Sequence, residues 1–257
     1  MQTEVRYYQQ PQLENAVMIC GLPGIGSVAW LAVNHLQKEL HAELLAEVFS
    51  PMFSPKVWLG EDGVVGLMRG EFHFWKNKPG GSDLLLFTAN EQPYSPEGQY
   101  ELAEVALNLA NKYGAKRVIT MGGMATDRLA EEPRVYAGAT SPDLVKELEA
   151  FGAVKLAGGA ITGTNGLIFG LAKPKNIPAI CLLAETPGYL SLDANAAKAA
   201  LQLSSRMLNI PIDLTALEKQ AKENADVVKK AKDLSHAFPR ESRRGGDRGE
   251  DKLHYVS

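Results

Sequence analysis

Short apolar segments alternate with amphipathic helical segments along most of this chain, and this alternation restricts the fold more than any other feature. Residues 17–20 are apolar, residues 27–40 show helical periodicity, and residues 44–49 are again largely apolar. Residues 84–88 are apolar up to their final threonine, as is typical of a parallel strand buried on both faces. We therefore predict an α/β fold with a mostly parallel sheet and flanking helices.

The same alternation continues as far as residue 208. We expect further helices over 97–113, 142–151, 164–173 and 193–208, and further strands over 118–121, 134–137 and 179–183. Residues 57–68 differ, because apolar runs flank the turn Asp62-Gly63. This pattern predicts an antiparallel hairpin that continues into an antiparallel strand over 69–75.

The composition is that of an ordinary globular chain. Of its 257 residues 45% are hydrophobic and 22% are charged, and the net charge of -3 gives no general attraction to nucleic acid or to an anionic membrane. The sequence has neither a signal peptide nor a run of about 18 uncharged apolar residues, so we expect a cytoplasmic protein. Cys20 and Cys181 fall in predicted buried strands, where two reduced thiols are expected rather than a disulfide.

Beyond Pro211 the chain becomes highly charged. Asp213, and Thr215 with its capping-box spacing to Glu218, predict a C-terminal helix over 213–238. Its heptad positions are weakly apolar, so a short coiled coil and a helix packed on its own core are both open alternatives. The predicted organisation is a core domain over 1–212, the charged helix over 213–238 and a flexible tail over 239–257.

The tail ends in a segment that differs from the rest of it. Residues 239–252 contain many charges and no aliphatic residue, so they bury too little apolar surface to offset the entropy cost of ordering. The last five residues are instead an apolar and aromatic cluster: Leu253, His254, Tyr255, Val256 and Ser257. A charged tether that ends in an apolar and aromatic cluster predicts a short docking peptide. The alternative is a chain end that frays and has no function.

Four predicted loops follow strands at the edge where open α/β sheets bind ligands: 21–26, 89–93, 122–127 and 184–189. The first contains Gly24 and Gly26, and its amides are candidates to hold an anion, although the spacing is not that of a dinucleotide site. Glu91 and Glu185 are candidates for an acid and a base in one shared crevice. The alternative is that each carboxylate caps a helix or holds loop amides. Metal and serine-hydrolase motifs are absent, and we expect no metal and no cofactor.

Five short motifs occur in a fixed order over roughly residues 13 to 208. They are Gly21–Gly26, Asn90–Pro93, Thr120–Gly123, Gly159–Leu167 and Leu182–Tyr189, followed by Asp193 and by Ala196 with Ala197. In this order they resemble the second branch of the proteasome assembly chaperone family, and the archaeal members look most similar. The resemblance implies a phosphorylase- or hydrolase-like α/β fold without catalytic residues, self-association into a homo-oligomer, and a role in assembling or binding the 20S proteasome.

The resemblance also implies a use for the C-terminus. Family members dock through a C-terminal hydrophobic–Tyr–any tripeptide that enters pockets between proteasome α-subunits. Here Tyr255 stands third from the end instead of second, which shifts the terminal carboxylate by one residue. The resemblance thus implies a non-enzymatic assembly chaperone or proteasome-binding factor that docks to α-subunits partly through residues 253–257. Two alternatives are a nucleoside-phosphorylase-like enzyme that uses Glu91 and Glu185, and an oligomeric scaffold for another protein.

Overall fold

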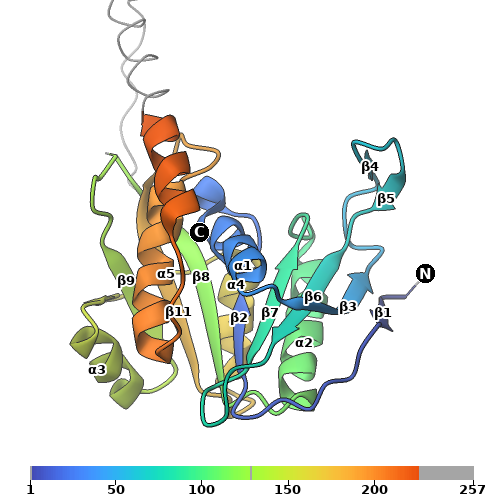
Figure 1. Cartoon of the computed structure of the whole chain (residues 1–257), viewed down its shortest axis with the longest axis horizontal. Helices are drawn as coiled ribbons and strands as arrows, with labels where there is room; N and C mark the ends of the chain where they lie inside the picture. The colour runs from blue at the N-terminus through green and yellow to red at the C-terminus, as the bar shows by residue number, and fades with distance from the viewer. Residues whose placement is uncertain (1, 128, 226–257) are drawn as a thin grey trace, which may run out of the picture.

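A mixed nine-stranded sheet runs through the centre of the molecule. The computed structural model describes residues 2–127 and 129–225. The strand order in the sheet is β1-β3-β6-β7-β2-β8-β11-β9-β10 (Figure 1). Its strands are β1 (Glu4–Tyr7), β2 (Val17–Cys20), β3 (Glu43–Phe49), β6 (Gly70–Trp75), β7 (Leu84–Ala89), β8 (Arg117–Thr126), β9 (Val135–Ala139), β10 (Val154–Lys155) and β11 (Ala179–Pro187).

The centre of the sheet is parallel and its flanks are antiparallel. Strands β7, β2, β8 and β11 run parallel to one another. On one side β6, β3 and β1 follow in successive antiparallel pairings, and on the other side β9 is antiparallel to β11. The predicted α/β class is confirmed, and so is the antiparallel addition formed by the residues after the hairpin.

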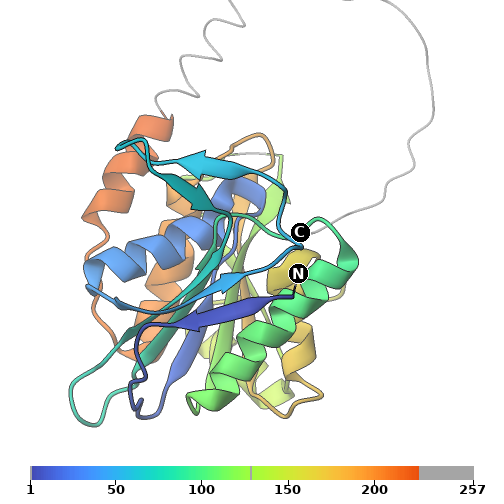
Figure 2. The same ribbon diagram turned by 90° about the vertical axis from the view of Figure 1, so that its right-hand side faces the viewer.

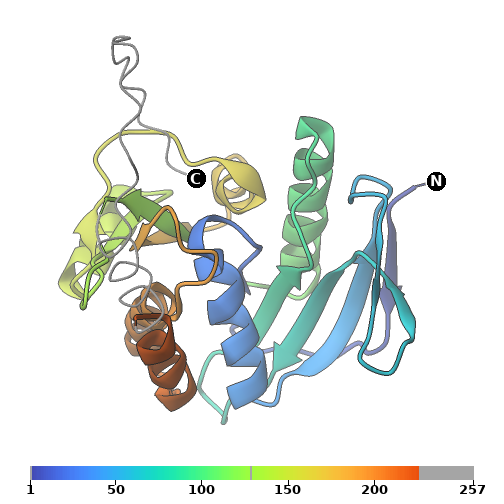
Figure 3. The ribbon, with the colours of Figure 1, turned by 90° about the horizontal axis from the view of Figure 1, so that it is seen from above.

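Helices cover both faces of the sheet. Helices α1 (Val28–Glu39) and α5 (Ala194–Leu208) lie on one face, and α2 (Pro96–Lys112) and α4 (Gly163–Ala172) lie on the other (Figure 3). Helix α3 (Pro142–Ala150) packs beside β9 and β10, and the short helix η1 (Ile25–Ser27) precedes α1. Alternate residues of the buried strands enter the two cores, because successive side chains of a strand point to opposite faces.

Two strands continue beyond the ends that the sequence predicts. Strand β8 passes through Gly122-Gly123 to Thr126, and β11 extends to Pro187; the two pair over this whole length. The predicted loops 122–127 and 184–189 are therefore mostly strand. A glycine pair usually marks a turn, but here both glycines pair with β11 as extended strand, and the loop after β2 lies over Gly123.

The predicted hairpin forms a sheet of its own. Strands β4 (Val57–Leu59) and β5 (Val65–Leu67) pair with each other in antiparallel register and project away from the large sheet (Figures 1 and 2). Gly63 in the connecting turn has a φ of 76°, a left-handed conformation that glycine adopts without steric cost. The Asp-Gly signal thus located the turn correctly.

The described part of the charged C-terminal helix packs on the body of the protein. Residues 215–225 are helical, and Leu217 and Ala221 contact the core on the α1–α5 face. His35 Nε2 lies 2.6 Å from the carbonyl oxygen of Asp213 and connects α1 to the start of this segment. Over these residues the alternative of a helix packed on its own core is confirmed. The predicted remainder of the helix, 226–238, and the predicted tail lie outside the described residues.

Both cysteines are buried free thiols, as predicted. Burial raises the pKa of Cys181 to about 11, against the opposing effect of a hydrogen bond with Thr120, so this thiol stays protonated. Over residues 2–127 and 129–225, no helix has the length and apolar character needed to cross a membrane.

Candidate functional site

The loop after β2 packs tightly against the carboxyl edge of the sheet. Gly26 has a φ of 60°, and a Cβ atom there would lie 2.7 Å from Thr186 Oγ1. A Cβ atom on Gly123 would lie 2.5 Å from the carbonyl oxygen of Ile25. Both distances are too short for a real Cβ contact, so glycine is required at these two positions for close packing. The glycine-rich loop therefore packs directly on Gly123 of β8 and on the Thr186 side chain of β11.

Two amide side chains fasten this loop to helix α4. Asn165 Oδ1 accepts a hydrogen bond from Leu22 N at 3.2 Å, and its Nδ2 donates to Leu22 O at 3.2 Å. Gln92 Nε2 donates to the carbonyl oxygen of Pro23, and Gln92 Oε1 accepts from Thr164 N at 2.6 Å. The Asn165 and Gln92 side chains are thus engaged with the protein's own backbone instead of being available to a ligand.

A buried carboxylate fastens the same loop to helix α5. Asp193 is 3% exposed, and its backbone N–H donates to Gly26 O at 2.8 Å. Its Oδ2 accepts from Thr186 Oγ1 at 2.8 Å, and its Oδ1 accepts from the amides of Asn195 and Ala196 at the start of α5. One side chain therefore caps α5 and connects it to strand β11.

A small cavity remains where these loops meet. It has a volume of about 120 Å³ and is bordered by Gly24, Gln92, Gly123, Asn165 and Cys181, among other residues. Pockets that bind small molecules usually measure roughly 300–1,000 Å³. This cavity is too small for a nucleoside. Of the two predicted glycines, Gly24 borders the cavity, whereas Gly26 is covered by Thr186 and Asp193.

Glu91 is engaged by the loop that precedes the hairpin. Its Oε1 accepts hydrogen bonds from Ser54 N at 2.6 Å and from the Ser54 hydroxyl, and Lys56 Nζ lies 2.6 Å from its Oε2. Burial opposes the charged form, but Lys56 and the two Ser54 donors outweigh it and hold the pKa of Glu91 below its ordinary value. An ionised, ion-paired carboxylate is poorly suited to exchange protons near neutral pH.

Glu185 is engaged in the same way by strand β9 and the residue before it. It is 5% exposed, and its Oε1 accepts from Arg134 Nε at 2.9 Å and Nη2 at 2.6 Å. Its Oε2 accepts from the backbone amide of Arg134 at 3.1 Å. Burial again opposes ionisation, but these Arg134 contacts and the Tyr136 hydroxyl lower the pKa of Glu185. The fork geometry of the guanidinium fixes this carboxylate in place.

The structure does not bring the two candidate carboxylates together. Glu91 follows β7 and Glu185 belongs to β11, and strands β2 and β8 lie between them. Three inter-strand steps of about 4.8 Å separate them by about 14 Å. Each carboxylate instead holds a backbone amide, which is the structural role that the sequence left open. The shared acid–base crevice is therefore not assembled.

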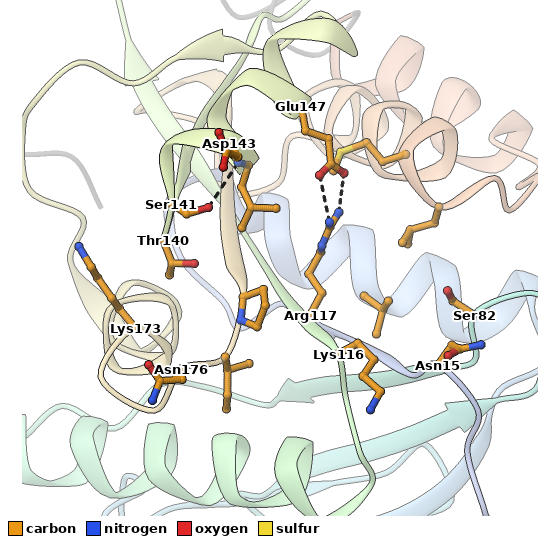
Figure 4. Close-up of a pocket in the computed structure, with 16 residues that line it drawn as sticks. Asn15, Ser82, Lys116, Arg117, Thr140, Ser141, Asp143, Glu147, Lys173 and Asn176 are labelled. Carbon is orange, nitrogen blue, oxygen red and sulfur yellow. Dashed lines mark hydrogen bonds and ion pairs between the residues drawn. The ribbon is translucent and has the colours of Figure 1, made fainter.

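A wider pocket lies at the opposite edge of the sheet. Its volume is about 950 Å³, and it opens at the amino ends of β2, β8 and β11 (Figure 4). Arg117 reaches across it to Glu147 through two hydrogen bonds of 2.7 and 3.0 Å. Open α/β sheets bind ligands at the carboxyl ends of their strands, so this pocket is at the edge that ligands seldom use. Its arginine already has a carboxylate partner.

Acidification is expected to destabilise the fold partly through Glu91 and Glu185. Because both pKa values lie below the ordinary value in the folded state, the stabilisation is present above the ordinary carboxyl pKa and is lost as the pH falls through the folded-state pKa. The melting temperature of the wild type should therefore fall more steeply between about pH 7 and about pH 3 than that of Glu185→Gln. Parallel curves for the two proteins would contradict this account of Glu185.

The layered fold and the closed carboxyl edge define a class: an α/β protein with helices on both faces of a mixed sheet, whose usual ligand edge is closed by its own side chains. Comparison with known proteins identifies the family within this class. The model of the PAC2 family matches residues 18–232. The chain belongs to the PAC2 family, and the resemblance inferred from the five motifs is confirmed.

Individual relatives agree with this assignment. The uncharacterized protein MJ1210 of Methanocaldococcus jannaschii is 40% identical over 222 residues, which are 86% of this chain and 84% of the relative. PbaB of Pyrococcus furiosus, described as an archaeal proteasome activator, is 36% identical with a TM-score of 0.84; the match covers 90% of this chain and 99% of PbaB. PbaA of the same organism, described as an archaeal homolog of proteasome-assembly chaperone, is 26% identical with a TM-score of 0.75, covering 93% and 95%.

The predicted docking segment, 253–257, lies outside the described residues. Within them, sequence reasoning missed the residues that close the carboxyl edge, namely Gln92, Asn165 and Thr186. All three fall inside the motifs of the family resemblance, which was the available signal. Their roles depend on partners between 7 and 143 residues away in the sequence, so the motifs alone do not reveal them.

Proposed function

We propose that this chain is a non-enzymatic, homo-oligomeric, cytoplasmic proteasome-binding factor of the assembly chaperone type. Its partners are the α-subunits of the 20S proteasome, and part of the contact is made by residues 253–257. The observation that carries the proposal is the similarity to PbaB, which extends over nearly the whole of both chains at 36% identity.

Two further observations support a binding role over an enzymatic one. The carboxyl edge of the sheet is occupied by hydrogen bonds between loops and leaves a cavity of only about 120 Å³. The two carboxylates considered for acid–base chemistry are ion-paired, and strands β2 and β8 separate them. Neither feature favours turnover of a nucleoside.

Deletion of residues 253–257 tests the role of the C-terminus. The shortened chain is expected to lose at least about tenfold in affinity for purified 20S α-subunits, because a short peptide that buries one tyrosine and one or two aliphatic side chains contributes on the order of a few kcal/mol. When several chains in one oligomer bind together, the loss is larger through effective concentration. Binding is measured by biolayer interferometry with immobilised α-subunits and full-length chain in solution.

Two point variants make this test specific. Tyr255→Ala should reproduce most of the loss, whereas Tyr100→Ala removes an exposed tyrosine of α2 that is 52% exposed and should bind like the wild type. Equal affinity of the wild type and the deletion variant would remove residues 253–257 from the contact. Absence of any binding by the wild-type chain would remove the proteasome assignment itself.

A further inference from the structure

The β4–β5 hairpin presents an aliphatic face to solvent. In its register Val57 pairs with Leu67 and Leu59 pairs with Val65, so these four side chains share one face of the two-stranded sheet. They are 56%, 52%, 70% and 61% exposed, respectively. Val64 beside the turn is 62% exposed. Scattered exposed aliphatic residues are ordinary, but a whole sheet face of them marks an interaction surface.

The opposite face of the hairpin is already occupied. Trp58 pairs with Gly66 and lies flat across it, since a Cβ atom on Gly66 would be 2.3 Å from the indole ring. The Arg69 guanidinium lies 5.8 Å from the centre of this ring. This packing orders the hairpin and leaves Trp58 41% exposed, less than any of the four residues of the aliphatic face. A two-stranded sheet gains most of its stability from packing such a face against another element.

A groove continues the aliphatic face at the base of the hairpin. It measures about 510 Å³, and its lining includes Val57 and Leu67 from the hairpin and Phe49, Phe53 and Met68 from the body. The apolar surface therefore extends from the tip of the hairpin to the large sheet. A partner that covers the face would also reach this groove.

The charges around the aliphatic face favour one orientation of a second copy of the hairpin packed against it. The tip of the hairpin bears Glu61 and Asp62, both exposed, and the base bears Lys56, whose side chain is 54% exposed. Two hairpins stacked tip to tip would bring four carboxylates together. If the hairpins stack tip to base, each acidic tip meets the Lys56 ammonium of the other copy. This ammonium has three donor hydrogens, so it can still donate to the tip while it is paired with Glu91.

We propose that the β4–β5 hairpin is a self-association surface, on which the aliphatic face packs against the same face of a second copy, tip to base, about a two-fold axis. The contact is isologous: Leu59 and Val65 of each copy approach the base and groove of the other. This proposal deepens the homo-oligomeric part of the proposed function and does not depend on docking to the proteasome.

The size of the face agrees with a contact that needs both the hairpin and the groove. One two-stranded face offers a few hundred Å², less than the roughly 800 Å² per partner of a standard interface. Addition of the groove lined by Phe49, Phe53 and Met68 brings the apolar surface closer to that value. The four-residue face itself carries no charged side chain, so packing of the two faces buries no charge at the centre of the contact.

Polar substitution of the face is the first test. The full chain with Leu59→Ser and Val65→Thr is compared with a matched control, Leu192→Ser and Val154→Thr, whose residues are 40% and 38% exposed and lie outside the hairpin. Mass is measured by light scattering after size exclusion over a range of concentrations. The hairpin variant should dissociate into smaller species with a dissociation constant about 100-fold higher, because each two-fold contact loses four apolar side chains. The control should keep the wild-type mass.

Cysteine cross-linking tests the orientation and does not depend on weakening the contact. The native cysteines are buried, so single exposed cysteines at Asp62→Cys in the tip and Pro55→Cys at the base report on the surface alone. A mixture of the two variants should form a disulfide-linked pair under mild oxidation, whereas neither variant should cross-link with itself.

Three results would overturn the proposal. They are a monomeric wild type at all concentrations, an unchanged mass of the Leu59→Ser, Val65→Thr variant, and no cross-link in the mixture. If this variant keeps its mass but no longer binds α-subunits, the face belongs to the proteasome contact instead. Loss of binding by the 253–257 deletion with an unchanged oligomer leaves the hairpin proposal intact, so the two proposals fail separately.

Discussion

Gly123→Ala is expected to lower the free energy of unfolding by about 3 kcal/mol, the upper part of the range for overpacking a well-packed site. The added Cβ would lie 2.5 Å from Ile25 O and 2.7 Å from Thr186 Cγ2. The first of these is a backbone atom of the loop after β2, and this loop is also held by Asn165 and Gln92. Rotation of a side chain cannot move this backbone oxygen away, so either the loop or strand β8 must shift.

A glycine in β9, which β11 separates from β8, provides the control. Gly138 lies in β9, and a Cβ atom there would lie 3.7 Å from Phe169 Cζ, an ordinary contact. Gly138→Ala should therefore change stability by less than about 1 kcal/mol. Urea denaturation of both variants measures the difference. Equal shifts of the two midpoints would show that the loop does not press on β8.

The helices and central strands were predictable because their patterns are set locally. The segment 27–40 was predicted as a helix from its apolar periodicity and is observed as Val28–Glu39. The uniformly apolar segment 84–88 is observed as strand Leu84–Ala89. Strand β1 was not predicted, because the alternation of Glu4–Tyr7 extends over only four residues and its pairing with β3 is a tertiary contact. The true end of β8 was missed for the same reason, because the loop that covers Gly123 is distant from it in the sequence.

The carboxyl edge shows what sequence cannot supply. Both carboxylates were predicted to follow core strands: Glu91 does follow β7, whereas Glu185 lies within the last residues of β11, and both sit at this edge. The role of each carboxylate depends on its partners. Glu91 is bound by Lys56 and Ser54, and Glu185 is bound by Arg134, which lies 51 residues earlier in the sequence. A carboxylate at a strand end has the same sequence signature whether it awaits a substrate or holds an arginine. Only the three-dimensional arrangement distinguishes the two.

Asp193→Ala is the second substitution with a large expected effect. It removes the N-cap of α5, worth about 1 kcal/mol, and leaves the buried Thr186 hydroxyl without its acceptor, which costs roughly 1–3 kcal/mol. We expect a total loss of about 3 kcal/mol in the free energy of unfolding. Asp193→Asn keeps one side-chain oxygen and should lose less.

A helix N-cap residue that has no buried hydrogen-bond partner separates the capping contribution of Asp193 from the contribution of its contact with Thr186. Ser141 caps α3 through its contact with Leu144 N, and Ser141→Ala should cost only about 1 kcal/mol. In a double-mutant cycle, Asp193→Ala combined with Thr186→Val should lose less than the sum of the single changes, since removal of both partners leaves no unsatisfied group. Strict additivity would mean that Asp193 acts on α5 alone.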